Sequence, residues 1–218
     1  MYKVTFGEYN SFDDFGLYLT NLQISEPSVK SNYINLPARD GQLDLSGVLS
    51  DTPLYDMRTI NYTFVWRSNV DDFESEVSAI VNALHGQTLD VIHGSSPYYY
   101  HGKVSVTSPT ITNDKAQINI SLNADPYALK RVKTETDIIL SGTATAHTLI
   151  NAGGKKVVPE FTLAGSGTPT ATVVFGNVTV SMDAGTHRFA NIVFASGENT
   201  ITVSGSGTLT VAFREGTL

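Results

Sequence analysis

The sequence predicts two mainly β domains, of which the first carries one α-helix. Three observations predict this. Polar and apolar residues alternate with period two in several segments, one stretch near residues 69–85 repeats its apolar residues at helical spacing, and the last third consists of short strand-like segments between glycine-rich turns. We expect residues 1–133 to form a β-sandwich-type domain that includes the helix, and residues 134–218 to form a β-sandwich of the jelly-roll kind.

The composition indicates a folded protein without thiol chemistry. The chain has 218 residues, 41% of them hydrophobic, and no cysteine, which excludes disulfide scaffolds, thiolate metal sites and cysteine nucleophiles. No apolar run approaches the ~18 residues that a membrane-spanning helix needs. The first residues, MYKVTFGEYNSF, lack the basic and apolar regions of a secretory signal. We therefore expect neither membrane insertion nor a signal peptide.

The distribution of charge argues against nucleic-acid recognition and marks the domain boundary. Fourteen Lys and Arg stand against 21 Asp and Glu, whereas duplex-binding proteins carry a basic stripe for the phosphates. The longest basic cluster, Lys130-Arg131-x-Lys133, is interpreted as a solvated linker. All ten Tyr and the one Trp precede residue 134, and the second part is sparsely charged. This shift places the boundary at about residues 126–136.

In the first domain, alternation predicts strands and spacing predicts the helix. Strands Ile34–Leu36 and Gln42–Leu45 flank Pro37-Ala38-Arg39-Asp40-Gly41, in which Asp40 and Gly41 tolerate the positive φ of a tight turn. The helix has Ser68 or Asn69 as its cap, Asp71, Asp72 and Glu74 in its first turn, and Gly86 at its end. Segment Arg58–Trp66 places one apolar face inward, made of Ile60, Tyr62, Phe64 and Trp66. Three antiparallel strands follow, at Thr88–His93, Tyr98–Val106 and Ala116–Asn123.

In the second domain, glycine-rich turns recur about every ten residues. Two of these turns, Gly165-Ser166-Gly167 and Gly205-Ser206-Gly207, are interpreted as hairpin turns. A phosphate-binding loop needs a helix directly after the glycines, and here strands follow them. The predicted strands are Asp137–Leu140, His147–Asn151, Pro159–Ala164, Thr170–Phe175, Val178–Met182, Gly185–Phe189, Ile192–Phe194, Asn199–Val203 and Thr208–Arg214.

No residue pattern predicts catalysis, a cofactor or a metal. His85, His93 and His101 are evenly spaced, but a turn at residues 94–97 would place Asp90 opposite His101 and His93 opposite Tyr98. The histidines would then not meet, so ordinary surface or half-buried histidines are expected. Catalytic, cofactor-binding and metal-binding residues are therefore all predicted as none, and an enzyme is not expected. Carboxylates from separate loops could still converge in space, which keeps enzymatic activity open as a third interpretation.

A carbohydrate-binding adhesin is the main alternative function, with the jelly roll as the binding domain. Sugar recognition usually uses an exposed Trp or Tyr as a platform, and residues 134–218 contain neither. A polar contact through His187, Arg188 and Asn191 is conceivable, although a satisfied surface cluster is favoured. The five phenylalanines of this domain are predicted to form its core. In the first domain, the run Tyr98–Tyr100 fits an interface as well as a core.

The order of elements and several motifs resemble the distal tail proteins of siphophages, over nearly the whole chain. Residues 36–45, LPARDGQLDL, resemble that family's Pro-Gly-Arg-Asp-Gly-x-Leu-Asp stretch, with Ala38 in place of the frequent glycine. Tyr55-Asp56-Met57-Arg58 is similar to its Tyr-x-x-Arg, and Asp125-Pro126-Tyr127 to its Asp-Pro-aromatic end. The resemblance implies a galectin-like jelly roll at residues 134–218. It also implies fold- or ring-forming roles, without chemistry, for Pro37, Arg39, Asp40, Gly41, Asp44, Tyr55, Arg58, Asp125 and Pro126.

The resemblance further implies a structural hub at the tip of a phage tail. Members of this family form a hexameric ring through their N-terminal domains, between the tail tube protein and the tail-associated protein, and DNA passes through the ring. Their jelly rolls project outward and can hold receptor-binding or baseplate proteins. The implied location is the virion tail tip, after assembly in the host bacterial cytoplasm. No long insertion interrupts residues 134–218, so receptor binding by this chain itself is less expected.

Overall fold

The computed structural model describes residues 2–38, 40–46, 48, 52–66, 73–107, 109–112 and 115–218. The chain divides into two compact units, Met1–Ala128 together with Leu218, and Leu129–Thr217. The sequence places the division at residues 133 and 134. The structure assigns residues 129–133 to the second unit, where strand β11 (Ala128–Lys130) pairs with β19 (Gly216–Thr217).

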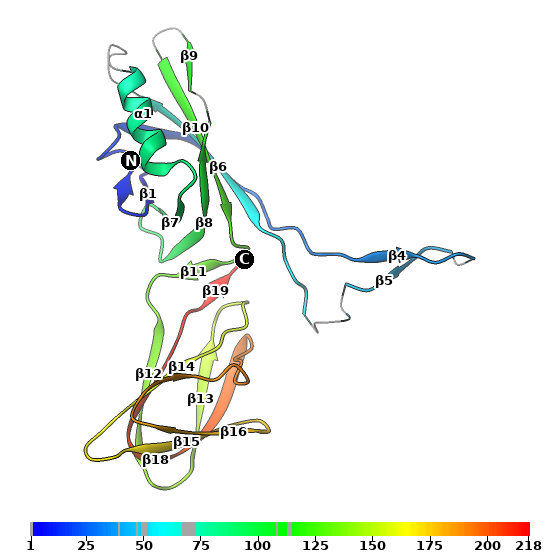
Figure 1. Cartoon of the computed structure of the whole chain (residues 1–218), viewed down its shortest axis with the longest axis vertical. Coiled ribbons are helices and arrows are strands. Elements are labelled where there is room, and N and C mark those ends of the chain that lie inside the picture. The colour runs from blue at the N-terminus through cyan, green and yellow to red at the C-terminus, as the bar shows by residue number, and fades with distance from the viewer. Residues whose placement is uncertain are drawn as a thin grey trace. The chain divides into compact units, whose positions relative to one another are not determined.

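The first unit is built on one sheet with the strand order β2-β1-β7-β8-β10-β6-β3 (Figure 1). All the neighbouring strands along this order whose register is known pair antiparallel. A short further strand, β9, pairs with β10. The bounds are β1 (Val4–Phe6), β2 (Tyr9–Asn10), β3 (Leu17–Ile24), β6 (Arg58–Trp66), β7 (Thr88–His93), β8 (Tyr98–Val106), β9 (Thr110–Thr112) and β10 (Lys115–Ala124).

The core of the first unit lies on one face of this sheet, as the alternation predicts. In β6, Ile60, Tyr62, Phe64 and Trp66 are all buried. Helix α1 (Phe73–Leu84) packs into the same core through Ile80 and Leu84, and Gly86 follows it with a φ of +78°, a conformation that glycine adopts without strain. The predicted helix is confirmed over residues 73–84. Its expected caps and first acidic residues, Ser68, Asn69, Asp71 and Asp72, lie outside the described residues.

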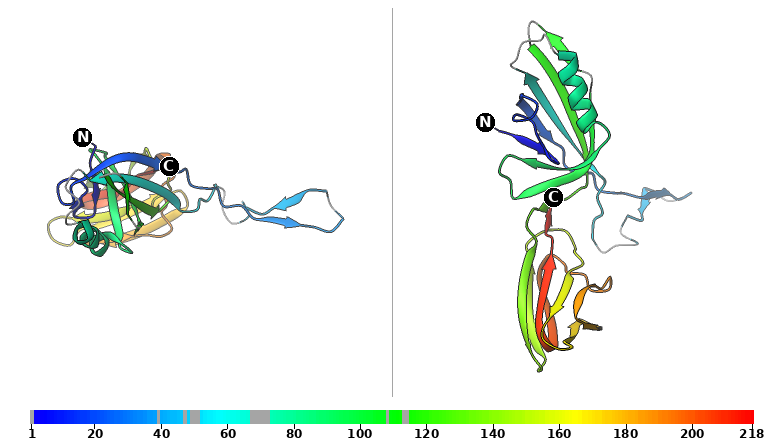
Figure 2. Two further views of the ribbon diagram at one scale, coloured as in Figure 1. Left: turned by 90° about the horizontal axis from the view of Figure 1, so that it is seen from above. Right: turned by 60° about the vertical axis from the view of Figure 1, so that its left-hand side comes forward.

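The segment between β3 and β6, residues 25–57, is called the arm below. It contains a separate two-stranded sheet, β4 (Tyr33–Asn35) and β5 (Gln42–Asp44), which pair with each other in the predicted antiparallel hairpin. In the part of the arm that the structure describes, no strand joins the main sheet. Figure 2 shows the arm as a narrow projection from its unit.

The second unit is a β-sandwich organised around one long strand, β18 (Gly197–Phe213). The first half of β18 pairs with β13 and β15, and its second half with β12 and β14, so that it belongs to both faces of the sandwich. Strand β16 pairs with β15, and β17 with β14. The bounds are β12 (Thr134–Ser141), β13 (Thr145–Asn151), β14 (Glu160–Ala164), β15 (Thr170–Phe175), β16 (Val178–Asp183) and β17 (Gly185–Arg188).

The predicted hairpin turn at Gly205-Ser206-Gly207 is wrong. The chain runs on through these residues as part of β18, so the two strands expected at 199–203 and 208–214 are one. Gly205 and Gly207 have φ values of +134° and +104°. A Cβ on Gly205 would lie only 2.0 Å from Thr170 O, and a Cβ on Gly207 only 2.4 Å from Ala164 O. The glycines therefore permit a corner, at which the strand changes from one sheet to the other.

Two further expectations for the second unit have different outcomes. The segment Ile192–Phe194 is not a strand and contributes one isolated bridge, between Val157 and Phe194. The phenylalanine core is confirmed: Phe161, Phe194 and Phe213 are buried, and Phe175 and Phe189 pack against them. The mainly β fold with one helix, predicted from alternation and spacing, is thus confirmed.

Candidate assembly surface

The arm exposes apolar side chains that no core covers. Seven large apolar side chains between residues 25 and 57 are 41–68% exposed: Val29, Tyr33, Ile34, Leu36, Val48, Leu54 and Met57. A folded monomer rarely gathers so many apolar side chains on one exposed segment, and such a surface usually marks an interface. The arm is therefore the part of the described surface best suited to contact with another protein.

Main-chain hydrogen bonds hold the arm in an extended form. Lys30 N donates to Leu54 O at 2.8 Å and Asp56 N donates to Ser28 O at 2.9 Å, on either side of a bridge between Val29 and Tyr55. The two sides of the arm therefore run antiparallel toward β4 and β5. Its shape comes from its own ladder, since its apolar side chains find no interior to pack into.

The turn at the tip of the arm differs in detail from the prediction. The loop spans residues 36–41, and positive φ falls on Ala38 (62°) and Gly41 (76°) rather than on the pair Asp40 and Gly41. Ala38 thus occupies a left-handed conformation, at the position where the resembling family often has glycine. That conformation costs a residue with a Cβ about 1–2 kcal/mol. Pro37, Asp40 and Gly41 are exposed at this tip, and Arg39 lies outside the described residues.

Asp44 stabilises the end of the hairpin through local hydrogen bonds. Its Oδ1 accepts a hydrogen bond from Ser46 N at 2.8 Å, and Ser46 Oγ accepts one from Asn32 N at 2.8 Å across the arm. Hydrogen bonds from the side chain and the backbone of Ser46 lower the pKa of Asp44. Asp44 therefore serves local structure, and its carboxylate is held charged.

At the base of the arm, Arg58 is buried beneath a partly exposed network. Arg58 is 2% exposed, its Nη2 donates to Glu26 Oε2 at 3.0 Å, and its Nη1 donates to Tyr100 OH at 3.4 Å. The guanidinium also lies over the Tyr100 ring, 5.5 Å from the centroid. Its Nε is buried without a hydrogen-bond partner among the described residues. Glu26 is the second residue of the arm and Arg58 directly follows the arm, so this contact joins its two ends.

Near the same base, Tyr55 contacts Tyr127, which directly follows the half-buried residues Asp125 and Pro126. The rings of Tyr55 and Tyr127 are edge-to-face with centroids 6.0 Å apart, while Asp125 N donates to His101 O at 2.8 Å. Burial, with a smaller contribution from Tyr55, raises the pKa of Tyr127. Of the sequence-predicted residues, Pro37, Asp40 and Gly41 therefore lie at the tip of the arm, Asp44 at the opposite end of its hairpin, and Tyr55 and Arg58 near its base.

Sequence reasoning missed a buried polar chain that continues from Arg58 into the core. Tyr62 OH and His93 Nε2 are 2.7 Å apart, and the rings of His93 and Tyr100 lie 5.2 Å apart. Burial lowers the pKa of His93 to about 4 and raises that of Tyr62. One signal was available: Arg58 has the same parity in β6 as the buried Ile60 and Tyr62.

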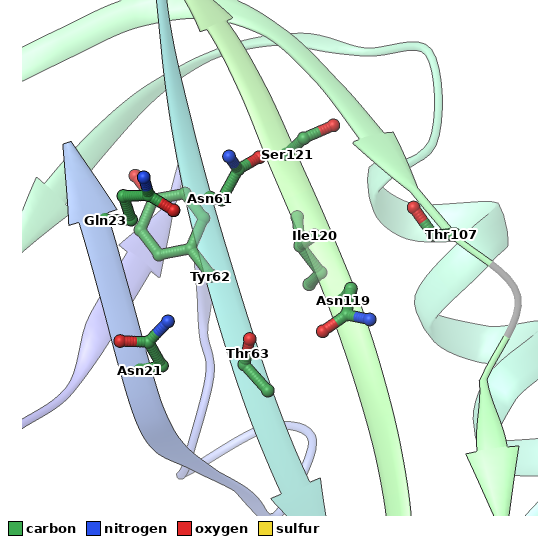
Figure 3. Close-up of a pocket in the computed structure, with 9 residues that line it drawn as sticks. All are labelled: Asn21, Gln23, Asn61, Tyr62, Thr63, Thr107, Asn119, Ile120 and Ser121. Atoms are coloured by element: carbon green, nitrogen blue, oxygen red, sulfur yellow. The ribbon is translucent and has the colours of Figure 1, made fainter. Parts of the chain in front are cut away.

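On the face of the sheet opposite the core, two neighbouring cross-strand rows over β3, β6 and β10 consist of amides and hydroxyls. Cross-strand rows join Gln23, Asn61 and Ser121, and then Asn21, Thr63 and Asn119. These six residues, with Thr107, Tyr62 and Ile120, line a cavity of about 270 Å³ (Figure 3). Such rows can donate and accept hydrogen bonds but offer no charge to hold a phosphate.

The described histidines and carboxylates do not assemble a metal site. No group of three or more His, Asp or Glu among the described residues is placed to hold a metal ion. The predicted register is confirmed: Asp90 pairs with His101, and His101 Nδ1 lies 2.7 Å from Asp90 Oδ1 on the surface.

The polar cluster considered for sugar binding is engaged in ion pairs. Arg188 donates through Nε and Nη2 to Glu160 Oε2, at 3.1 and 2.9 Å, and Lys133 Nζ donates to Glu160 Oε1 at 2.9 Å. Hydrogen bonding to Lys133, followed by Arg188, lowers the pKa of Glu160 despite partial burial. His187 lies 3.4 Å from Asp183. Arg188 and His187 thus have acidic neighbours, as the sequence favoured for these two residues.

Comparison with known proteins identifies the fold. No family model matches the sequence, and no curated protein gives a significant match. Among solved structures, the chain matches the SPP1 Dit protein, described as a paradigm of the hub adsorption apparatus in phages that infect Gram-positive bacteria. That match has a TM-score of 0.71 and 13% identity and covers 100% of both chains. The chain therefore has the fold of a phage distal tail protein over its full length.

Two weaker matches are chains of the phage p2 baseplate in its activated conformation, with Sr and with Ca. Both have a TM-score of 0.41, with 7% and 8% identity, and they cover 97% and 98% of this chain and 97% of each matched chain. At that TM-score they support no inference. In the part of the chain that the structure describes, no helix is long and apolar enough to cross a membrane.

Proposed function

We propose that this chain is a structural protein of a phage tail tip, and that six copies form a ring between the tail tube protein and the tail-tip proteins. The observation that carries the proposal is the arm, an extended ladder with seven exposed apolar side chains and no core of its own. The shared fold with the SPP1 Dit protein is consistent with this role.

A ring built from head-to-tail contacts gives the arm a partner. In a closed ring, each copy presents one surface to the copy before it and a different surface to the copy after it. An arm that reaches from one copy to the next would bury its apolar side chains in every copy at once. The Arg58–Glu26 contact, which joins the two ends of the arm, would then hold the arm at its base while the tip engages the neighbour.

The two uncharged polar rows on β3, β6 and β10 suit the channel of such a ring. DNA that must move through a channel is slowed by Lys and Arg, because each phosphate contact adds affinity. The rows of Gln23, Asn61 and Ser121 and of Asn21, Thr63 and Asn119 carry no charge. We place this face toward the channel, with the jelly rolls outside, where baseplate or receptor-binding proteins would attach. Assembly would take place in the host bacterial cytoplasm.

Light scattering over a concentration series tests the ring. Six copies of the 23.5 kDa chain would weigh about 141 kDa. We expect that mass for the purified chain, and ring-shaped particles by electron microscopy. The double variant Ile34→Ser and Leu36→Ser, at two exposed residues of the arm, is expected to shift the mass toward the monomer. Ile150→Ser with Val158→Ser, at exposed positions of the second unit, serves as the matched control.

Two results would refute the proposed role. One is a monomer at every concentration, both alone and mixed with the tail tube protein. The other is a 141 kDa particle that the arm variant leaves unchanged, because the arm would then have no part in assembly. In the monomer case, glycan binding by the purified chain is the next measurement, since the adhesin interpretation predicts it.

A further inference from the structure

Strand β12 (Thr134–Ser141) leaves one side of its backbone unpaired. Its ladder partner is β18, along residues Ser206–Phe213, and among the residues of the second unit, all of which the structure describes, no strand pairs with its other side. β12 lies at the outer boundary of its unit in Figure 1 and in the right-hand view of Figure 2. It is therefore an open sheet edge eight residues long.

The register shows which backbone groups point outward. Gly142 N donates to Gly205 O at 2.8 Å, in register with the pairs Ser141–Ser206 and Leu140–Gly207. In an antiparallel ladder, alternate residues turn their N–H and C=O groups toward the same neighbour. Leu140 and Ile138 therefore bond to β18, whereas the N–H and C=O groups of Ser141, Ile139 and Asp137 point away from it.

Charged side chains protect this edge against pairing with another strand at one end only. Open edges are usually protected by charges, by proline or by shortness. Glu135 and Asp137 supply charge at the start of β12, but the chain from Ile138 to Ile150 holds no Asp, Glu, Lys or Arg. Ile139 is 81% exposed, and its own N–H and that of Ser141 both point away from β18. The second half of β12 thus combines free main-chain groups with a bare apolar side chain.

We propose that β12 binds an extended strand of another tail protein, which adds to the sheet beside it. An extended polypeptide is the partner that meets an N–H and a C=O at every second residue. The chemistry of the edge also defines the added strand: an apolar residue beside Ile139, uncharged residues near Ser141, and Lys or Arg opposite Glu135 and Asp137. This inference rests on the proposed tail-tip role and names a surface by which the second unit holds its partner.

The test uses a substitution that changes the outward side of β12 alone. Ser141→Pro removes an N–H that points away from β18 and leaves the hydrogen bonds of Leu140 and Gly142 to β18 in place. Proline is tolerated at such a position of an edge strand. Ser141→Ala keeps that N–H and is the matched control. Hydrogen exchange of residues 135–141 is measured in the purified ring and in assembled tails from the producing phage, together with the solution mass of each variant and the amount of the chain in tails.

We expect the outward amides of Ile139 and Ser141 to exchange within seconds in the free ring and at least 100-fold more slowly in tails. Ser141→Pro should form a ring of normal mass but lose the protection of Ile139 in tails, and phage titre should fall at least tenfold, while Ser141→Ala should resemble the unmodified chain.

Equally fast exchange in tails and in the free ring would overturn the proposal. So would protection that already rises with the concentration of the purified chain, because two copies would then be pairing edge to edge. If the purified chain forms no ring and is absent from tails, the tail-tip role itself fails, and this inference fails with it. The mass and the tail content distinguish that case from the others.

Discussion

Lowering the pH from 7 to 5 is expected to destabilise the first unit through one buried side chain, His93. This imidazole is 7% exposed, with Nε2 2.7 Å from Tyr62 OH. Burial lowers its pKa from an ordinary 6.5 to about 4. The folded unit therefore holds His93 neutral down to about pH 4, whereas the unfolded chain takes up a proton below about pH 6.5. Stability is fully present above that pH and falls as the pH drops toward 4.

The magnitude follows from the two pKa values. A difference of about 2.5 pH units corresponds to roughly 3 kcal/mol when the transition is complete, because each unit is worth about 1.4 kcal/mol. At pH 5 the unfolded state has bound its proton and the folded state has not, and the loss is about 2 kcal/mol. The comparison at pH 5 keeps clear of most carboxylate titration, which occurs near pH 4.

The single tryptophan makes the measurement specific to the first unit. Trp66 is 6% exposed within that core, so urea unfolding followed by tryptophan fluorescence reports this unit rather than the second. With an m-value of 1–3 kcal/mol/M, a loss of about 2 kcal/mol lowers the urea midpoint by about 1 M between pH 7 and pH 5. His93→Gln cannot titrate and should remove most of this difference. His101→Gln, at a surface imidazole, should retain it. An unchanged midpoint at pH 5, or a full shift in His93→Gln, would refute the reasoning.

Three further predictions concern the corner, the arm base and the polar face. Gly205→Ala places a Cβ about 2.0 Å from Thr170 O and should cost the second unit several kcal/mol in thermal unfolding, whereas Gly154→Ala, with nothing within 4 Å, should cost less than about 1 kcal/mol. Arg58→Ala, which removes a buried side chain and its packing against the Tyr100 ring, should lower the free energy of unfolding of the first unit by about 3 kcal/mol, measured by urea unfolding. Glu26→Gln should cost less than about 1 kcal/mol, because the Glu26 side chain is 84% exposed. Asn61→Lys with Asn119→Lys should make the ring retain linear duplex DNA in a salt-dependent manner but not closed circular duplex, and equal retention of both would show that this face does not line a channel.

Local pattern was sufficient wherever one periodicity decided the structure. The observed strands at Arg58–Trp66, Thr88–His93, Tyr98–Val106 and Thr170–Phe175 coincide with the predicted ranges. In each, apolar residues face a core on one side of the sheet or lie between turn signals. The helix was equally readable, because Ile80 and Leu84 lie on one face at a spacing of four residues.

The features that sequence analysis missed or misassigned depend on residues that are distant in the sequence. Gly205 and Gly207 adopt positive φ, as a hairpin turn would require, but here that freedom bends a continuous strand. Whether glycines turn a chain or bend it depends on the neighbouring strands, in this case β12, β14 and β15, and local sequence does not contain them. The burial of Arg58 is similar: its parity in β6 pointed inward, but its partners Glu26 and Tyr100 lie 32 and 42 residues away.

The two units and the arm place different demands on the sequence. This difference bears on how the fold is shared with the SPP1 Dit protein at only 13% identity. Within each unit, the requirements are an apolar side chain at every second position of a strand and glycine at a few corners, and many sequences meet them. In the proposed ring the arm obeys another rule, since its apolar side chains would be matched to a surface of the neighbouring copy. A substitution there would be tolerated only when that surface accepts it, so arm and neighbour would have to change together. If the ring is correct, arm exchange between two such proteins should block mixed assembly while each unit still folds, which separates the demands of folding from those of assembly.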